Sequence, residues 1–477
     1  MTEFAPIAFT NTFAKLPPRF FDRQAPVPVR DPKLIRVNHA LAEAMGLNPS
    51  DLESEPGVAV LAGNVIPDGA DPLAMAYAGH QFGGWVPQLG DGRAILLGEH
   101  KGRDGIGRDI QLKGSGRTAF SRSGDGRAWL GPVLREYVVS EAMAALGIPT
   151  TRALAAVSTG ETVQRETALP GAILTRVARA HIRVGTFQYF AARQDLDGLR
   201  VLADYAISRL YPDLRSADCP YRALLQQVTD RQADLIARWM SVGFIHGVMN
   251  TDNVSIAGET IDYGPCAFMD HFHPETVFSS IDHMGRYAWI NQPGIAQWNL
   301  AQFAGTLLPL MEDDPDRAVE DAQAIIDGFT GAYGAAYLRH MGPKIGIADL
   351  REDDGDLIVA LLAQMTESRA DFTNTFRNLD LFAARDDMTE WAARWRDALT
   401  RYDVADPASV MNAANPAVIP RNHRVEAMIN AAVAGDFGPF DTLNRVLTSP
   451  YHLSPGDASF ADAPLASEVV ERTFCGT

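Results

Sequence analysis

The segment FIHGVMNTDNVSIAGETIDYG, residues 244–264, constrains the fold of this chain more tightly than any other. It contains two short runs of β-forming residues, VSI and TID, with a three-residue turn between them, which predicts a tight hairpin. Such a hairpin would hold Asn253 and Asp262 at its two ends. An amide oxygen and a carboxylate in that arrangement can share one Mg²⁺ on a nucleoside triphosphate.

The same segment resembles the metal-binding loop of protein kinases, in which the Asn of H-R-D-L-x-x-x-N and the Asp of D-F-G hold the metal. His246 to Asn253 align with the first motif, but Val248 stands where kinases have the catalytic Asp. A valine cannot accept a proton, so phosphoryl transfer to a protein hydroxyl would lack its base. The only carboxylate between His246 and Asn253 is Asp252. The segment therefore predicts either an inactive kinase or different chemistry on the same nucleotide.

A glycine-rich turn precedes the first strongly apolar strand. Gly90 and Gly92 form a G-x-G in QLGDGR, and the apolar run Ala94–Gly98 follows. The pattern, interpreted as strand, glycine turn and strand, is typical of a loop that covers nucleotide phosphates. Ile95 occupies the place of a third glycine, and a single G-x-G also occurs in ordinary hairpins, so this turn alone is weak evidence.

A lysine and a glutamate come next with the spacing of a kinase ion pair. Residues 109–113 alternate polar and apolar side chains, which predicts a strand that ends in Lys113. A helix is predicted over residues 132–146. In kinases the lysine of the third strand binds phosphates and pairs with a glutamate of the following helix. Glu136 is the expected partner of Lys113, and Glu141 is the alternative.

Positive charge gathers around these elements. Residues 114–131, GSGRTAFSRSGDGRAWLG, combine glycines with arginines, which suits phosphate binding. Arg176 ends a predicted buried strand, and Arg183 lies seven residues further on, in a predicted helical stretch. The whole chain has a formal net charge of −17, so this local clustering indicates a bound anion.

Several longer stretches resemble the selenoprotein O family, called YdiU in bacteria, over essentially the whole chain. They are YAGHQFGGWVPQLGDGRA, QLKGSGRTAFSRSGDGRA, LREYVVSEAM, GVMNTDN, TIDYGPCAFMD and ERTFCGT. The resemblance implies a pseudokinase fold in which ATP binds reversed relative to kinases. It also implies an enzyme that transfers AMP to Ser, Thr or Tyr hydroxyls of proteins and releases pyrophosphate. Transfer of UMP from UTP is a variant of the same reaction.

The resemblance also implies roles for individual residues. Asp252 would accept the proton of the attacking hydroxyl, and Asn253 and Asp262 would bind Mg²⁺ or Mn²⁺. The implied nucleotide ligands are Gly90, Gly92, Arg93, Lys113, Asp125, Gly126, Arg176, Arg183 and Asp262. AMP transfer agrees with the residues themselves, because the leaving pyrophosphate carries most of the developing charge and needs dense cationic support. Whether Asp252 or the metal does most to activate the hydroxyl stays open.

The predicted fold class is α+β, a protein-kinase-like bilobal fold with a small β-rich N-lobe and a large helical C-lobe. We expect a wrapping segment at residues 1–75, the N-lobe at 76–178, the C-lobe at 179–312, and a helical extension with a redox tail at 313–477. The helices expected outside the N-lobe are His39–Met45, Tyr221–Val242, Ile295–Leu310, Ala318–Ala336, Leu357–Phe376, Thr389–Tyr402 and Val425–Ala434.

Composition narrows the class of protein. A hydrophobic content of 46% and a charged content of 21% predict a globular protein with a large core. The net charge of −17 argues against nucleic acid as a partner. No apolar run approaches a membrane span, and residues 1–14 lack the core of a signal peptide. We therefore expect a cytoplasmic monomer that acts on proteins and binds no membrane.

The three cysteines, Cys219, Cys266 and Cys475, are too few for a disulfide framework. By the family resemblance, Cys475 takes the place that selenocysteine has in vertebrate members. Cys266 follows DYGP at the end of the expected metal-binding segment. We hypothesise a reversible Cys266–Cys475 bond that ties the tail across the active site and changes activity with redox state.

Two other functions are alternatives to AMP transfer. The first is a catalytically silent pseudokinase that acts as a nucleotide-binding scaffold. The second is a small-molecule kinase, which the pair His246-Gly247 favours and Val248 opposes.

Overall fold

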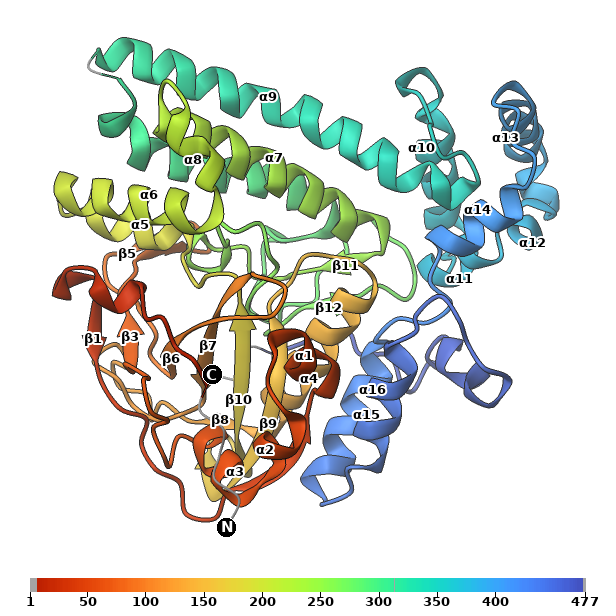
Figure 1. The fold of residues 1–477 in the computed structure, drawn as a ribbon. Coiled ribbons are helices and arrows are strands. Elements are labelled where there is room, and N and C mark those ends of the chain that lie inside the picture. The colour runs from red at the N-terminus through yellow and green to blue at the C-terminus, as the bar shows by residue number, and fades with distance from the viewer. Residues whose placement is uncertain (1–6, 313, 475–477) are drawn as a thin grey trace.

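The computed structural model describes residues 7–312 and 314–474, and in that part of the chain it is an α+β protein (Figure 1). Most strands lie in the first 180 residues, and helices dominate the remainder. The strands are β1 (Phe21–Arg23), β2 (Lys33–Val37), β3 (Leu73–Met75), β4 (Gly79–Gln81), β5 (Gly84–Val86), β6 (Ala94–Lys101), β7 (Gly107–Lys113), β8 (Ala128–Trp129), β9 (Arg152–Gln164), β10 (Ala168–Ala178), β11 (Phe244–Ile245) and β12 (Ala267–Phe268).

The α-helices divide into three groups that Figure 1 separates. Short helices near the N-terminal side are α1 (His39–Met45), α2 (Pro49–Glu53) and α3 (Glu55–Leu61). The central helices are α4 (Leu130–Ala145), α5 (Val184–Ala191), α6 (Leu196–Leu210), α7 (Pro220–Ser241), α8 (Gln292–Met311) and α9 (Pro315–Met341). The last group is α10 (Asp356–Glu367), α11 (Phe372–Arg377), α12 (Leu379–Ala383), α13 (Thr389–Arg401), α14 (Pro407–Ala414), α15 (Asn422–Val433) and α16 (Gly438–Leu447).

The main sheet has the strand order β1-β3-β6-β7-β10-β9-β2, with β8 paired to β10, and its pairs are antiparallel. In the register of β7 with β10, Gln111 lies opposite Arg176 and Lys113 lies opposite Leu174. Side chains two residues apart on a strand, and directly opposite on its neighbour, share one face of a sheet. Gln111, Lys113 and Arg176 therefore project from the same face.

Helix α4 connects this sheet to the C-terminal helices. It packs against β9 and β10 on one side and against α15 and α16 on the other (Figure 1). The ring of Tyr137 on α4 meets the ring of Phe440 on α16 edge to face, with centroids 5.4 Å apart. Because α4 is covered on both sides, Glu136 on this helix is 3% exposed and needs cationic partners.

The segment before β3 wraps the molecule and contributes to its core. Phe13 and Phe20 are buried in the largest apolar cluster, and the ring of Phe20 packs on that of Phe190 in α5 at 4.3 Å. The same segment supplies both edge strands of the main sheet, β1 and β2.

Most expected helices form close to their predicted positions, including α1, α4, α7, α8, α9, α13 and α15. The single helix expected over residues 357–376 is wrong, because the chain forms α10 and α11 with a break between them. Arg369 in the break has a left-handed backbone with φ of 51°. Asp371 then caps α11 by accepting a 2.8 Å hydrogen bond from the Asn374 amide, a local contact that competes with helix continuation.

The hairpin expected over residues 254–262 does not form. Ser255 forms an isolated bridge with Arg183, and Thr260 forms one with Thr150. Amides in both runs donate outside the segment, Ile256 to the Ile182 carbonyl at 3.1 Å and Thr260 to the Pro149 carbonyl at 2.9 Å. The two runs therefore pair with neighbouring parts of the fold rather than with each other.

The expected strand, glycine turn and strand around Gly90 and Gly92 is also different in the structure. The strand before the turn, β5, pairs with β4 in a separate two-stranded sheet. The strand after it, β6, pairs with β3 and β7 in the main sheet. The glycine turn is thus a connection between two sheets rather than the tip of one hairpin.

Among the described residues, no helix combines the length and the apolar character that crossing a membrane requires.

Candidate active site

A pocket of about 750 Å³ opens between the main sheet and the loop that follows β11. Every nucleotide-binding, catalytic and metal-binding residue expected from the sequence lines it. These residues are Gly90, Gly92, Arg93, Lys113, Asp125, Gly126, Arg176, Arg183, Asp252, Asn253 and Asp262.

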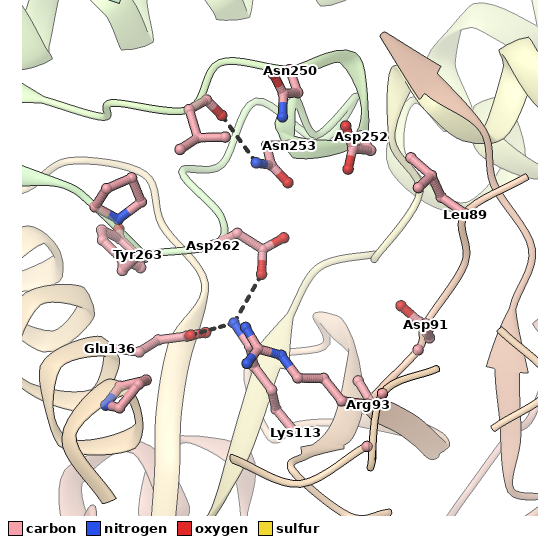
Figure 2. Close-up of a pocket in the computed structure, with 18 of the residues that line it drawn as sticks. Leu89, Asp91, Arg93, Lys113, Glu136, Asn250, Asp252, Asn253, Asp262 and Tyr263 are labelled. Carbon is pink, nitrogen blue, oxygen red and sulfur yellow. Dashed lines mark hydrogen bonds and ion pairs between the residues drawn. The ribbon is translucent and has the colours of Figure 1, made fainter. Parts of the chain in front are cut away.

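The expected pair of Lys113 and Glu136 forms at the floor of this pocket. The Lys113 Nζ donates to Glu136 Oε2 at 2.5 Å and to Asp262 Oδ1 at 3.0 Å (Figure 2). The alternative partner, Glu141, instead binds the Arg152 guanidinium at 2.6 Å and accepts from the Ala153 amide. Glu136 is therefore the partner of Lys113, and Glu141 stabilises the start of β9.

Two buried arginines complete the cationic floor. Arg176 Nη1 lies 2.7 Å from Asp262 Oδ1 and 3.3 Å from Glu136 Oε1, and its Nη2 donates to Gln111 Oε1 at 2.6 Å. Arg183 caps the start of α5 and reaches Asp262 Oδ2 at 3.3 Å. Each arginine is only 2% exposed, so both charges are held by the protein and not by water.

Asp262 thus has three cations around one carboxylate. Burial opposes its ionisation, but the charges of Arg176, Lys113 and Arg183 outweigh burial and hold the pKa of Asp262 well below its ordinary value. Asp262 also has a left-handed backbone, with φ of 65°, which is a strained conformation for a residue other than glycine. The fold therefore holds an ionised carboxylate at a fixed point beside Lys113.

Asp252 has the opposite electrostatic character. It is 8% exposed, and burial raises its pKa to about 6, against the opposing effect of a 3.2 Å hydrogen bond from Gln81 Nε2 to Oδ2. Its Oδ1 is buried and has no hydrogen-bond partner among the described residues. A carboxylate oxygen without a donor, lining a pocket, can accept a proton from a molecule bound there.

Asn253 lies in the short 3₁₀ turn Thr251–Asn253 and presents its oxygen to the pocket. Its Nδ2 donates to the Val248 carbonyl at 3.0 Å, which fixes the orientation of the amide. Figure 2 shows the Asn253 amide oxygen and the carboxylates of Asp252 and Asp262 around one space. No group of three or more His, Cys, Asp or Glu side chains in residues 7–312 and 314–474 forms a self-sufficient metal site.

The hairpin of β4 and β5 clamps the loop that contains Asp252. The His80 amide donates to Thr251 Oγ1 at 2.7 Å, and the Phe82 amide donates to Asn250 Oδ1 at 2.9 Å. Gly79 lies against Asp252, since a Cβ on this glycine would be 3.0 Å from Asp252 Oδ1. The close approach of the two segments fixes the position of the carboxylate.

Sequence reasoning missed this clamp, and with it Gln81 and Asn250. The available signal was the polar pair His80-Gln81 directly before Phe-Gly-Gly, in a stretch otherwise interpreted as an apolar turn. Nothing local in that stretch indicates that its partner lies about 170 residues further along the chain, at Thr251.

His246, at the start of the kinase-like motif, has a structural role. It is fully buried, it stacks on the Trp239 ring at 5.3 Å, and its Nε2 lies 2.8 Å from the Ile261 carbonyl. It therefore joins the loop that contains Asp252 to the segment that contains Asp262.

Two predicted glycines are required by close packing. A Cβ on Gly90, whose φ is 115°, would lie 2.3 Å from the Phe120 ring. A Cβ on Gly126, whose φ is 69°, would lie 2.2 Å from the backbone of Gly116. Asp125 beside it binds the Arg165 guanidinium at 2.8 Å, which lowers the pKa of Asp125. Arg165 lines the pocket as well and is a second residue that the sequence did not reveal.

The C-terminal segment reaches the rim of the pocket. Thr473 Oγ1 donates to the Pro265 carbonyl at 2.5 Å, its amide donates to the Phe278 carbonyl at 2.7 Å, and Phe474 lines the pocket. Cys266 is buried, and Cys475, its proposed partner, lies outside the described residues. Cys219 donates to the Met311 carbonyl at 3.0 Å, away from the pocket.

Comparison with known proteins gives one consistent result. Residues 3–448 match the family model described as protein adenylyltransferase SelO. A protein nucleotidyltransferase YdiU of Rhodopseudomonas palustris strain BisB5 is 59% identical over 486 residues, covering 98% of this chain and 99% of the relative. Proteins of the same name from Bradyrhizobium sp. strain ORS 278 and from Methylorubrum extorquens are 57% and 59% identical, with the same coverage of both chains.

Proposed function

The chain belongs to the protein adenylyltransferase SelO family, and on that premise we propose that this enzyme transfers AMP from ATP to Ser, Thr or Tyr hydroxyls of proteins and releases pyrophosphate. The observation that carries the proposal is the pair of unlike carboxylates in one pocket. Asp262 is ionised among three cations, and Asp252 is buried with an oxygen that lacks a donor among the described residues.

The proposed fold is the bilobal fold of protein kinases. The small lobe would extend over residues 76–178 and the large lobe over residues 179–312, with the wrapping segment before them and the helical extension after them. The ion pair of Lys113 on a strand with Glu136 on the next helix supports this assignment, because kinases place the same pair at the phosphates of ATP.

The triphosphate would bind the cationic floor. Lys113, Arg176 and Arg183 now share the carboxylates of Glu136 and Asp262. Phosphate oxygens would provide competing anionic partners for the same three cations, in a site where burial strengthens each interaction. The backbones at Gly90, Gly92 and Gly126, together with Arg93 and Asp125, would border the nucleotide.

The residues present fit a divalent cation. Mg²⁺ binds proteins through one or two carboxylate or amide oxygens and completes its shell with phosphates and water. Asn253 and Asp262 are such a pair, and the amide of Asn253 is already oriented by its bond to Val248. When bound, Mg²⁺ or Mn²⁺ would neutralise charge on the phosphates.

Asp252 would take the proton of the acceptor. The hydroxyl oxygen of the protein substrate forms a bond to the α-phosphorus, the bond from that phosphorus to the bridging oxygen breaks, and pyrophosphate leaves with the electron pair. The hydroxyl proton passes to Asp252 Oδ1, while Gln81 holds Oδ2. The cations of the floor stabilise the charge that develops on the leaving pyrophosphate.

One labelling experiment tests this function. The purified protein is incubated with ATP labelled at either the α- or the γ-phosphorus, with Mg²⁺ or Mn²⁺ and a mixture of proteins. We expect protein label from α-labelled ATP only. Label from γ-labelled ATP would indicate a kinase instead, and no label at all would indicate the silent scaffold.

Asp262→Asn is the matched variant for this experiment, because it keeps the shape of the side chain and removes its charge. We expect transfer to fall by at least about a hundredfold, since both the metal site and the arrangement of cations depend on that carboxylate. Unfolding temperature, measured in parallel, separates loss of chemistry from loss of fold. Transfer at the wild-type rate in a folded variant would reject the role of Asp262.

We also propose the reversible Cys266–Cys475 bond as a regulatory element. The contact of Thr473 with Pro265 supports it, because each residue is within two positions of one of the cysteines. Peptide mass mapping of oxidised protein should find this pairing, and activity should differ with and without reductant. A bridge that contains Cys219 would contradict it.

A further inference from the structure

A second depression, of about 510 Å³, lies next to the active-site pocket. Its lining is mostly apolar and comes from the β4–β5 turn and from the residues before and at the start of α8. The lining residues are Phe82, Met284, Arg286, Ile290, Asn291, Gly294 and Ile295, which we name the acceptor shelf. Phe82 lines both this shelf and the active-site pocket, so the two are continuous.

Phe82 is held at that border in a strained conformation. Its φ is 51° and that of Gly83 is 84°, so both central residues of the turn are left-handed. Hairpin turns of this kind favour Asn or Gly, and an aromatic residue there is unfavourable. The position is maintained by the bond from the Phe82 amide to Asn250 and by edge-to-face contact with the Tyr287 ring at 5.2 Å. Strain of this kind marks a side chain whose placement matters for function.

The shelf exposes large apolar side chains to solvent. Met284 is 92% exposed and Ile290 is 54% exposed, and Ile281, at the rim of the active-site pocket, is 56% exposed. Contiguous apolar side chains rimmed by polar residues mark binding surfaces on soluble proteins. Here they adjoin the one pocket in which a protein hydroxyl must meet the nucleotide.

Arg286 supplies a charge that the protein does not neutralise locally. Its guanidinium lies over the Trp298 ring at 4.8 Å and near the Tyr287 ring at 5.8 Å. Within residues 7–312 and 314–474 it has no carboxylate partner within ion-pair distance, and its Nε has no hydrogen-bond acceptor. An arginine oriented by aromatic rings rather than by an acid retains its planar set of donors for an incoming carboxylate.

We propose that the acceptor shelf binds the segment of the substrate protein beside its modified hydroxyl. A large apolar side chain of that segment packs on Met284 and Ile290, and an Asp or Glu side chain binds Arg286. Continuity with the active-site pocket places this segment within a few residues of the hydroxyl that reaches Asp252. The inference rests on the proposed function and names the class of sequence that the enzyme modifies.

A peptide array tests the proposal. Peptides with a central Ser, Thr or Tyr are varied one flanking position at a time and incubated with the full-length enzyme and α-labelled ATP. We expect the wild type to favour a large apolar residue at one fixed offset and Asp or Glu at another. Each preference should be about three- to tenfold, as for exposed single contacts.

Variants assign each preference to its residue. Met284→Ser with Ile290→Ser should abolish the apolar preference and leave the acidic one. Arg286→Glu should replace the acidic preference by a preference for Lys or Arg, whereas Arg286→Lys should retain it. Val359→Ser is the matched control, because Val359 is an exposed apolar residue at 67% on the distant helix α10. ATP affinity and unfolding temperature should stay at wild-type values in all four.

The outcomes separate this proposal from the proposed function. If wild-type enzyme labels no peptide and no protein, the proposed function fails. If it labels peptides but shows no flanking preference, or if the preference is unchanged in the shelf variants, the acceptor shelf is rejected. A dimer in sedimentation velocity that becomes a monomer in Met284→Ser with Ile290→Ser, with unchanged peptide preference, would show that a second copy occupies the shelf instead.

Discussion

A general base must be deprotonated before it acts, and this sets how the pH dependence of the enzyme should depend on Asp252. Burial is the main reason why the pKa of Asp252 rises to about 6, since it disfavours the charged form. Near neutral pH most molecules therefore hold this carboxylate ionised and ready to accept a proton. Below that pKa the base is already occupied.

We predict that kcat/KM for AMP transfer rises with pH and levels off above an apparent pKa of about 6. The sign follows from the direction of the shift, because a raised pKa moves loss of the proton to higher pH. Asp252→Asn should lower turnover by about 10²- to 10⁴-fold and remove this acidic limb. A variant with the same limb would assign the titration to another group, and recovery at high Mn²⁺ would indicate that Asp252 organises the metal instead.

Gln81 gives a second test at the residue scale. Its hydrogen bond to Asp252 Oδ2 stabilises the charged form and lowers the pKa of that carboxyl. Gln81→Leu removes the donor at similar size, so the acidic limb should move upward by about one pH unit. The plateau rate at high pH should change far less than in Asp252→Asn. A pH profile identical to that of the wild type would show that the contact does not tune the base.

At the scale of elements, one buried arginine joins three separate parts of the chain. Arg421, just before α15, is 1% exposed and binds Asp270, after β12, at 2.5 Å and Asp371, which caps α11, at 2.9 Å. The contact to Asp270 ties the segment after Asp262 to the C-terminal helices. Since two carboxylates share one buried cation, loss of that cation leaves both of them unpaired.

Arg421→Met should therefore lower the free energy of unfolding by roughly 3–5 kcal/mol. Arg385→Met is the control, because Arg385 and Asp387 form a surface pair and such pairs contribute about 0–1 kcal/mol. Chemical denaturation of both variants measures the difference. Equal stabilities would show that the buried network contributes no more than a surface ion pair.

The sequence predicted elements well where local periodicity decides the structure. The ends of α1 and the extents of α4, α7 and α13 follow from apolar spacing and from capping residues. Prediction failed where long-range contacts decide. The VSI and TID runs have strand character, yet Ile256 and Thr260 find their backbone partners at Ile182 and Pro149. A short segment's propensity does not identify its partner.

The site residues were more predictable than the local structure that holds them. Lys113, Glu136, Asn253 and Asp262 meet in one pocket although the hairpin expected to join the last two is absent. Their chemistry was legible because each type suits phosphate or metal binding. Gln81 and Arg165 were not, since an amide and a surface arginine have many ordinary roles and only the fold brings them to the pocket.

At the scale of the whole molecule, the wrapping segment stabilises regions that are far apart in the sequence. Phe20 has no exposed surface and packs on Phe190, across the largest apolar cluster. Phe20→Ala should lower the free energy of unfolding by about 3–5 kcal/mol, through lost burial and the cavity that remains. Val65→Ala, at a site that is 50% exposed, should change it by no more than about 0.5 kcal/mol. Thermal and denaturant unfolding check both, and a small effect at Phe20 would mean that the wrap contributes little.

The wrapping segment has a further consequence for the order in which the protein is made. β1 and β2 form opposite edges of the main sheet, yet they leave the ribosome before β3 and β9, with which they pair. The nascent chain must keep two strands unpaired until residues 152–158 of β9 emerge. Unpaired strands associate readily with other chains, so this interval is when a newborn molecule is most exposed to aggregation and most in need of a chaperone.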